Sequence, residues 1–119
     1  MQYMLLIYDD PKVWQEMSEG ERTGVMGEYL AYSESLRQAG VYVDGSPLEG
    51  TQTATTVRLR DGARLVTDGP FAETREALGG YYLLECESLD DALDHAGRCP
   101  SARLGSIEVR PIVQMPART

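Results

Sequence analysis

The chain has 119 residues, of which 42% are hydrophobic and 25% are charged, as expected for a single globular domain spanning residues 1–119. Its formal net charge of −8 opposes nucleic-acid binding, because affinity for a polyanion depends on neutralising phosphates. No apolar run reaches the roughly 18 residues of a membrane span, and the N-terminus lacks the pattern of a signal peptide, so we expect a cytoplasmic protein that binds neither nucleic acid nor membrane.

The first predicted elements are a strand and a long helix. Residues 2–8, QYMLLIY, are apolar at both parities, which is typical of a strand buried on both faces, and Asp9, Asp10 and Pro11 are expected to end it. Ser18 followed three residues later by Glu21 is the capping-box pattern of a helix start. Apolar residues then recur at helical spacing over residues 19–39, and Gly40 is the expected C-cap.

A β-hairpin is predicted next. After an extended piece at residues 41–48, residues 55–67 alternate on either side of Asp61 and Gly62, a pair that favours a type I′ turn. Three arginines of this hairpin form either a small basic patch or an ordinary solvated surface. They are Arg58, Arg60 and Arg64.

The second half of the chain repeats the order of strand and helix. Residues 80–87, GYYLLECE, again predict a strand that is apolar on both faces. Ser88, with Asp91 three residues later, indicates the start of a second helix. Residues 106–113 predict the last strand, in which Pro111 is typical of a sheet edge or a strand end.

This order of elements predicts an α+β fold, the ferredoxin-like split βαβ sandwich, with the hairpin as an insertion. Both helices of that fold cover one face of an antiparallel sheet. Because the two central strands are apolar on both sides, a monomer would expose a large apolar face, which soluble monomers rarely do. We therefore expect a homodimer with a barrel-like interface, with pockets near its rim or between helix and sheet.

The segment DGPFAETREALGGYYLLECES resembles the DGPF-type motif of the YCII-related family, with Arg75 where a lysine is usual. The segments LRQAGVYVDGSPL and CPSARLGSIEVRPI are also similar to that family, so the resemblance spans essentially the whole chain. It implies a dimeric α+β barrel of ferredoxin-like type. Its implication for activity is limited, although studied relatives are associated with a histidine–aspartate dyad and one eliminates chloride from an aromatic-ring metabolite.

The chain departs from that dyad at both positions. The resemblance places the family histidine near Tyr29 and the aspartate at Cys99, before Pro100. The only histidine, His95, falls in the last turns of the second helix, where its charge complements the dipole, so histidine catalysis is not carried over. Tyr29 is either a core residue of the apolar stripe or a hydrogen-bond donor and weak acid with an ordinary pKa of about 10.

The motif at residues 67–80, TDGPFAETREALGG, predicts a capped turn. Gly69 permits positive φ, Pro70 suits a first helical position, and Asp68 can accept hydrogen bonds from the following N–H groups. The remaining N–H groups of such a turn can hold a carboxylate or phosphate of a ligand. Phe71, the only phenylalanine, either anchors the turn on the core or forms the wall of a pocket.

Two glutamates follow in the same motif. Glu73 and Glu76 share one face if residues 70–77 form helical turns, and each would then raise the pKa of the other. Arg75 beside them favours the ionised forms and a solvated, salt-bridged turn instead. The predicted catalytic residues are Asp68, Glu73 and Tyr29, and the predicted ligand-binding residues are Gly69, Phe71, Arg75, Glu76 and Arg103.

Three functions remain open from the sequence. The first prediction is a protein that binds a small metabolite in a cleft beside the DGPF loop. The alternatives are a lyase or isomerase that uses carboxylate and tyrosine groups, and a regulatory partner in sigma-factor systems, as DGPF-type proteins are often labelled. Two cysteines and one histidine lack the spacing of a zinc site, so no metal ion and no cofactor are predicted.

Overall fold

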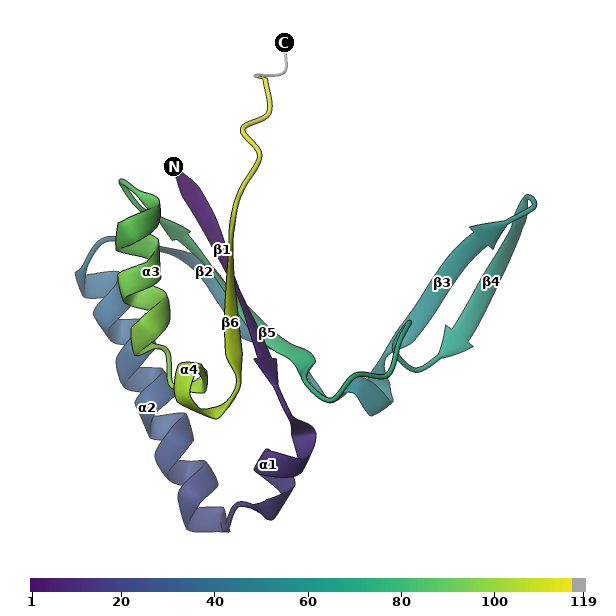
Figure 1. Ribbon diagram of the computed structural model, residues 1–119, viewed down its shortest axis with the longest axis horizontal. Helices are drawn as coiled ribbons and strands as arrows, with labels where there is room; N and C mark the ends of the chain where they lie inside the picture. Colours follow the sequence, from purple (N-terminus) through teal and green to yellow (C-terminus); the bar gives the residue numbers. More distant parts are fainter. Residues whose placement is uncertain (117–119) are drawn as a thin grey trace.

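The computed structural model describes residues 1–116, which fold into one layer of helices on one antiparallel sheet, with a hairpin that stands apart (Figure 1). The elements in chain order are β1 (Gln2–Asp9), α1 (Pro11–Glu16), α2 (Glu19–Gln38), β2 (Tyr42–Pro47), the 3-10 helix η1 (Thr51–Thr53), β3 (Thr55–Arg60), β4 (Ala63–Asp68), β5 (Ala77–Glu85), α3 (Leu89–Arg98), α4 (Ser101–Leu104) and β6 (Ser106–Pro111). Among the described residues, no helix is long and apolar enough to cross a membrane.

The four-stranded sheet has the order β2-β5-β1-β6, and every neighbouring pair is antiparallel. This is the strand order of the ferredoxin-like fold, with β3 and β4 inserted between β2 and β5. The predicted fold class is confirmed, and β1 and β5 are central, as their apolar sequences indicated. Leu6 of β1 lies opposite Tyr81 of β5 on one side and Glu108 of β6 on the other.

The predicted local signals form as expected. The Ser18 hydroxyl accepts a hydrogen bond from the Glu21 amide at 3.1 Å, and the Glu21 carboxylate accepts one from the Ser18 amide at 3.2 Å. Asp61 and Gly62 have φ values of 51° and 76°, the two positive values that a type I′ turn requires. At the start of α3, the Ser88 hydroxyl accepts a hydrogen bond from the amide of Asp91.

Two short helices, α1 and α4, were not predicted. Asp10 and Pro11 were interpreted only as the end of the first strand. In the structure the Asp10 side chain accepts a hydrogen bond from the Lys12 amide at 2.9 Å, and Pro11 occupies the first turn of α1. The same two residues therefore end one element and begin the next.

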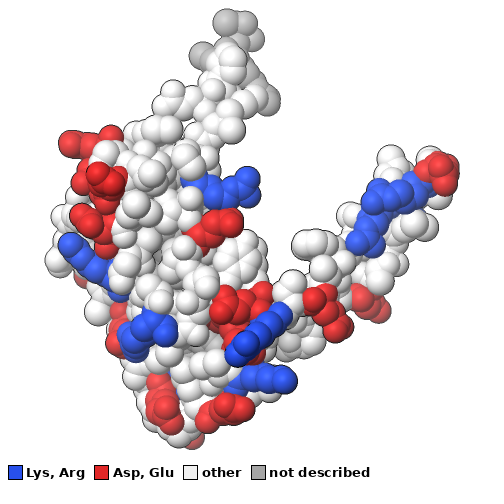
Figure 2. All heavy atoms as spheres, in the orientation of Figure 1, with Lys and Arg blue, Asp and Glu red and all other residues white. Residues whose placement is uncertain are grey.

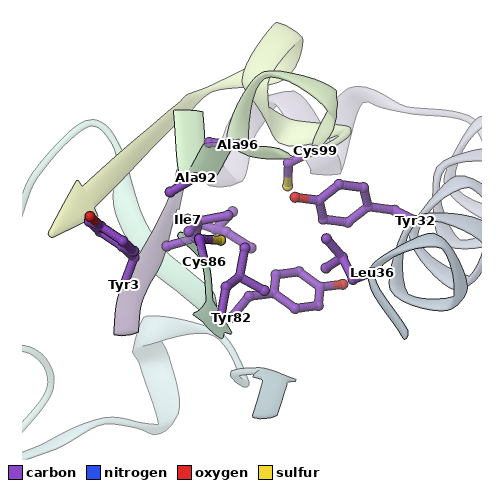
Figure 3. Packing of buried hydrophobic residues seen from close by; sticks show 11 residues of the cluster. Tyr3, Ile7, Tyr32, Leu36, Tyr82, Cys86, Ala92, Ala96 and Cys99 are labelled. Atoms are coloured by element: carbon purple, nitrogen blue, oxygen red, sulfur yellow. The ribbon is translucent and has the colours of Figure 1, made fainter. Parts of the chain in front are cut away.

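The core lies between the sheet and the helices α2 and α3 (Figure 3). β1 alternates strictly, so that every second side chain faces the helices and is buried. Leu5, Leu36 and Leu84 are fully buried where β1, α2 and β5 meet. The rest of this cluster consists of Tyr3, Ile7, Tyr32, Tyr82, Cys86, Ala92, Ala96 and Cys99.

None of residues 1–116 forms a layer over the opposite face of the sheet. The alternate side chains of β1 and β5 project there and are half-buried, and they form a continuous apolar strip across the two central strands. We call this strip the open sheet face; it consists of Met4, Leu6, Tyr8, Tyr81 and Leu83. The sequence pattern predicted this exposed apolar face in a single chain.

The hairpin of β3 and β4, residues 55–68, is called the arm. It forms its own two-stranded sheet, and Figure 1 shows it projecting from the body on the side of the sheet away from α2 and α3. The large apolar side chains of the arm are exposed, with 68% for Leu59 and 62% for Val57. The arm therefore adds little to the core of its own chain.

Two glycines provide a matched test of this packing. A side chain at Gly105 would collide with the carbonyl oxygen of Tyr8, whereas nothing lies within 4 Å of a side chain at Gly97, inside α3. We expect Gly105→Ala to lower the free energy of unfolding by about 1 to 3 kcal/mol, as overpacking does. Gly97→Ala should raise it by about 1 kcal/mol, because alanine favours a helix interior. Urea denaturation of both variants measures the two changes; equal stability of the two variants would contradict the packing described for Gly105.

Candidate functional site

A cleft of about 570 Å³ opens between the helices α1 and α2 and the sheet at β2 and β5. Its volume lies within the range of roughly 300–1,000 Å³ that is usual for small-ligand sites. Its walls are mainly aromatic and aliphatic, as such sites require. The aromatic lining residues are Trp14, Tyr29, Tyr42, Tyr81 and Tyr82, and the large aliphatic ones are Ile7, Met26, Leu30, Leu48 and Leu78.

Asp9, the last residue of β1, contributes a carboxylate to this cleft. Its Oδ1 atom is buried and accepts no hydrogen bond from the residues that the structure describes. A side chain at Gly79 would come within 3.3 Å of Oδ2, and one at Gly105 within 3.0 Å of Oδ1. The backbone at Gly79 and at Gly105 can therefore pass close to the carboxylate because neither residue has a side chain.

The surroundings of Asp9 raise the pKa of its carboxyl group above the ordinary value. Burial raises the pKa of Asp9, and the nearby charge of Glu76 raises it further. Ser101 and Trp14 lie close enough to the carboxylate to offset part of this rise in the pKa, although neither forms a hydrogen bond to Oδ1. A carboxyl group with a raised pKa in an apolar cleft is a candidate for taking up and releasing a proton.

Tyr29 lies on the wall of the same cleft and packs against the edge of the core. Its hydroxyl forms a short hydrogen bond with Ser101, which is fully buried, and accepts one from the thiol of Cys99 at 3.6 Å. Burial raises the pKa of Tyr29 above its usual value, so the phenol stays neutral. The weak acid expected from the sequence is therefore weaker still, and Tyr29 acts as a hydrogen-bonding group.

The positions that correspond to the family dyad are neighbours in space. Tyr29 and Cys99 belong to α2 and to the end of α3, and their side chains are in contact. Burial raises the pKa of the Cys99 thiol, which keeps it protonated. The ring of His95 is only half-buried in the last turn of α3, and its backbone carbonyl accepts a hydrogen bond from Tyr32 at 2.7 Å.

Residues 69–76, which we call the DGPF loop, lie outside the cleft. Residues 69–76 contain no helical turn, so Glu73 and Glu76 do not share a helical face as the sequence suggested. The reason is that Asp68 ends β4 in the ladder of the arm, where it pairs with Thr55 instead of capping a turn.

Gly69 has the expected positive φ of 101°. Its N–H, which we expected to be free for an anion, donates to the carbonyl of Ala54 at 2.7 Å. Phe71 is 77% exposed and anchors nothing in its own chain. The loop is thus a closure of the arm, and none of its residues lines the cleft.

The other predicted ligand-binding residues are distributed over separate surfaces. Arg75 pairs with Asp10 at 3.4 Å and is 91% exposed, so the expected salt bridge forms with a different carboxylate. Glu76 accepts a hydrogen bond from the Ser106 hydroxyl at 2.8 Å, on the side of Asp9. Arg103 pairs with Glu28 at 2.5 Å, beside a shallow depression on the far side of α2. Of the predicted site residues, Tyr29 is the one that lines the cleft.

The sequence interpretation missed Asp9, although a signal for it existed. The helix-facing series of β1 is Tyr3, Leu5 and Ile7, and Asp9 is the next member at the same spacing. A carboxylate that continues a buried series is unusual, because charged groups are rarely buried without a partner. From the sequence, Asp9 and Asp10 together are typical of a polar strand end, and that interpretation does not place Asp9 on the helix-facing side of the sheet.

Comparison with known proteins identifies the family. Residues 1–116 match the YCII-related domain. The chain belongs to the YCII-related family. A relative in this family, the uncharacterized protein R00369 of Rhizobium meliloti (strain 1021), is 41% identical over 114 residues, which cover 94% of this chain and 92% of that protein.

A solved structure shares the YCII-related fold described here. It is the 5-chloro-2-hydroxyhydroquinone dehydrochlorinase TftG of Burkholderia phenoliruptrix AC1100, in complex with 2,5-dihydroxybenzoquinone. The TM-score is 0.59 and the identity is 18%, and the match covers 97% of this chain and 96% of that one. At this identity the similarity shows the fold alone.

The raised pKa of Asp9 predicts how stability depends on pH. A carboxyl group whose pKa is higher in the folded chain contributes stability below its unfolded pKa of about 3.9, and this contribution is lost as the pH rises through the folded pKa. Asp9→Asn removes the buried charge, so this variant should melt at a higher temperature than the wild type at pH 7. The difference should shrink toward zero as the pH falls to about 4.

Thermal melts between pH 4 and 8 measure this effect. Asp94→Asn, on the exposed surface of α3, is the matched control and should show no such pH-dependent gain. A lower melting temperature for Asp9→Asn than for the wild type at pH 7 would show that the ionised Asp9 carboxylate does not destabilise the fold.

Proposed function

We propose that this protein binds a small ring-shaped metabolite in the cleft and transfers a proton to or from it through Asp9, as a lyase or isomerase does. The observation that carries the proposal is the buried Oδ1 of Asp9, which accepts no hydrogen bond from the described residues. A buried acceptor without a partner costs about 1 to 3 kcal/mol, and such a cost is retained where the group has a functional partner in a ligand.

The state of this carboxylate separates two of the functions left open by the sequence. A protein that only holds a metabolite needs a shaped, mainly apolar cleft. Proton transfer needs in addition a carboxyl group whose pKa is shifted toward neutrality. Because burial raises the pKa of Asp9 in such a cleft, the geometry favours proton transfer over passive binding.

The cleft suits a small, planar and mainly apolar ligand. Aromatic walls from Trp14 and Tyr42 can stack on a ring, and the volume of about 570 Å³ accommodates one or two rings. The phenol of Tyr29 and the carboxylate of Asp9 provide hydrogen-bonding groups for a ring hydroxyl or carbonyl. The similar solved structure, a dehydrochlorinase in complex with 2,5-dihydroxybenzoquinone, supports this class of compound.

The reaction follows from these two groups. Ionised Asp9 takes a proton from an acidic C–H or O–H of the ring compound. The negative charge that results is carried by the hydroxyl or carbonyl oxygen attached to the ring. Tyr29, held by Ser101, donates a hydrogen bond toward that oxygen. The proton then returns to another carbon, which is an isomerisation, or the electron pair expels a leaving group, which is an elimination.

Substitution of Asp9 tests this role. A panel of hydroxylated quinones and hydroquinones is assayed by the change in ultraviolet absorbance, with and without leaving groups. For the compound that the wild type converts, Asp9→Asn should lower kcat by at least about 100-fold while KM changes little, because general acid–base catalysis contributes roughly 10²–10⁴-fold.

Glu73→Gln, in the exposed DGPF loop, is the control and should keep the wild-type rate. If Asp9→Asn retains most of kcat, Asp9 is not the proton-transfer group. If the wild type binds a compound in the cleft but converts none, the passive-binding function replaces the catalytic one.

We also propose that two copies associate through the open sheet face. Met4, Leu6, Tyr81 and Leu83 form an apolar strip over which none of residues 1–116 forms a layer, and a second copy of the same strip covers it by symmetry. Polar residues of the edge strands, including Glu108 and Arg110 of β6, flank the strip. A cytoplasmic location remains our expectation from the sequence.

Substitution at the centre of the strip tests the dimer. Leu6→Glu introduces a charge between Tyr81 and Glu108, and it should weaken association by at least about 100-fold, because a buried charge without a partner costs several kcal/mol. Leu93→Glu, on the outer side of α3 where Leu93 is 47% exposed, should leave association unchanged. Analytical ultracentrifugation measures both. A wild type that stays monomeric at micromolar concentration would overturn the dimer.

A further inference from the structure

The arm forms its own two-stranded sheet, and its large apolar side chains are exposed in the part of the chain that the structure describes. Its six residue pairs, from Thr55 with Asp68 to Arg60 with Ala63, form a regular ladder. A two-stranded hairpin in water is marginally stable by itself. Polar contacts with the adjacent loop exist only at its base, where the Thr56 hydroxyl donates to Gly69 and Arg58 donates to the carbonyl of Phe71. Among the described residues, the arm therefore has little apolar support.

The two faces of the arm differ in character. The register pairs Val57 with Val66 and Leu59 with Arg64, so these four side chains share one face. Exposure is 62% for Val57, 68% for Leu59 and 56% for Val66, and we call these three residues the apolar arm face. The opposite face carries Leu65, with Arg58 and Arg60 around it.

The position of the arm indicates what lies beside it. Figure 1 shows α2 and α3 on one side of the sheet and the arm on the other, so the open sheet face and the arm border the same space. A second copy that covers the open sheet face occupies that space. It comes within reach of the arm without any change in the fold.

The distribution of charge also favours a second copy of this chain beside the arm. The arm carries three arginines and two aspartates, a net charge of +1, whereas the whole chain has a net charge of −8. Figure 2 shows basic side chains along the arm with acidic ones at its tip and near its base, and side chains of both signs over the body. A second copy of this chain presents an acidic body to a basic arm, and this complementarity steers association. An exposed apolar β-ribbon that stays uncovered would instead promote aggregation.

We propose that the arm of each protomer packs its apolar face, Val57, Leu59 and Val66, against the body of a second copy. The proposal rests on the sheet-to-sheet dimer proposed above and extends it, since the two arms clasp the partner from outside the paired sheets. Phe71, just beyond the end of the arm, is 77% exposed. In this proposal the DGPF loop connects the arm to β5, and the arm contributes to association of the two protomers.

Two leucines on opposite faces of the arm provide the test. Leu59→Ser and Leu65→Ser remove the same side chain from the same hairpin, one position apart in the register, and disturb the hairpin itself equally. The dissociation constant of the dimer is measured by analytical ultracentrifugation. Leu59→Ser should raise it by at least tenfold, and Leu65→Ser by less than twofold. Equal effects of the two substitutions would overturn the assignment of the apolar arm face.

Removal of the arm separates this proposal from the dimer on which it rests. The amide of Gly69 donates to the carbonyl of Ala54 at 2.7 Å, so the two ends of the arm are adjacent and residues 55–68 can be replaced by Asn-Gly. The shortened chain should still dimerise, with a dissociation constant raised at least tenfold. An unchanged constant overturns the arm contact and leaves the sheet dimer intact. A monomeric wild type overturns both.

Discussion

The two-residue alternation along β1 is the constraint on which the remaining structure depends. One series, Tyr3, Leu5 and Ile7, is buried under the helices, and the other, Met4, Leu6 and Tyr8, forms the open sheet face. Because side chains of a strand point alternately to opposite faces, a shift of one residue would exchange the two series. The same alternation fixes which face of the sheet takes the core and which face stays open.

The helix-facing series of β1 also sets the chemistry, because it ends in a carboxylate. Asp9 follows Ile7 on the buried side and is enclosed by Gly79 and Gly105, so its Oδ1 is out of water and without a hydrogen bond among the described residues. The stability of the core holds this costly group in place. Behind the cleft, Ser101 fixes the phenol of Tyr29, which gives the carboxylate a neutral hydrogen-bonding neighbour.

The sequence predicted the elements whose signals are local. The capping box of Ser18 and the turn at Asp61 and Gly62 depend on neighbouring residues alone, and both form as expected. The site depends on residues brought together from β1, α2 and α4, which no spacing reveals. The distinctive DGPF motif led to the prediction of a site in this loop. In the structure Gly69 and Phe71 follow the last strand of the arm and lie outside the cleft. Tyr29 was found through the family resemblance, and Asp9 was missed because its face was not considered.

The protonation of Asp9 in the folded protein decides whether the cleft is an acid–base site. Carbon-13 NMR of selectively labelled aspartate, assigned to Asp9 with the Asp9→Asn variant, follows the carboxyl resonance as the pH changes. We expect a midpoint clearly above the ordinary aspartate pKa of about 3.9, since burial raises the pKa of Asp9. A midpoint at or below that value would mean that the carboxylate is well solvated or paired, and the proton-transfer function would then have no group to perform it.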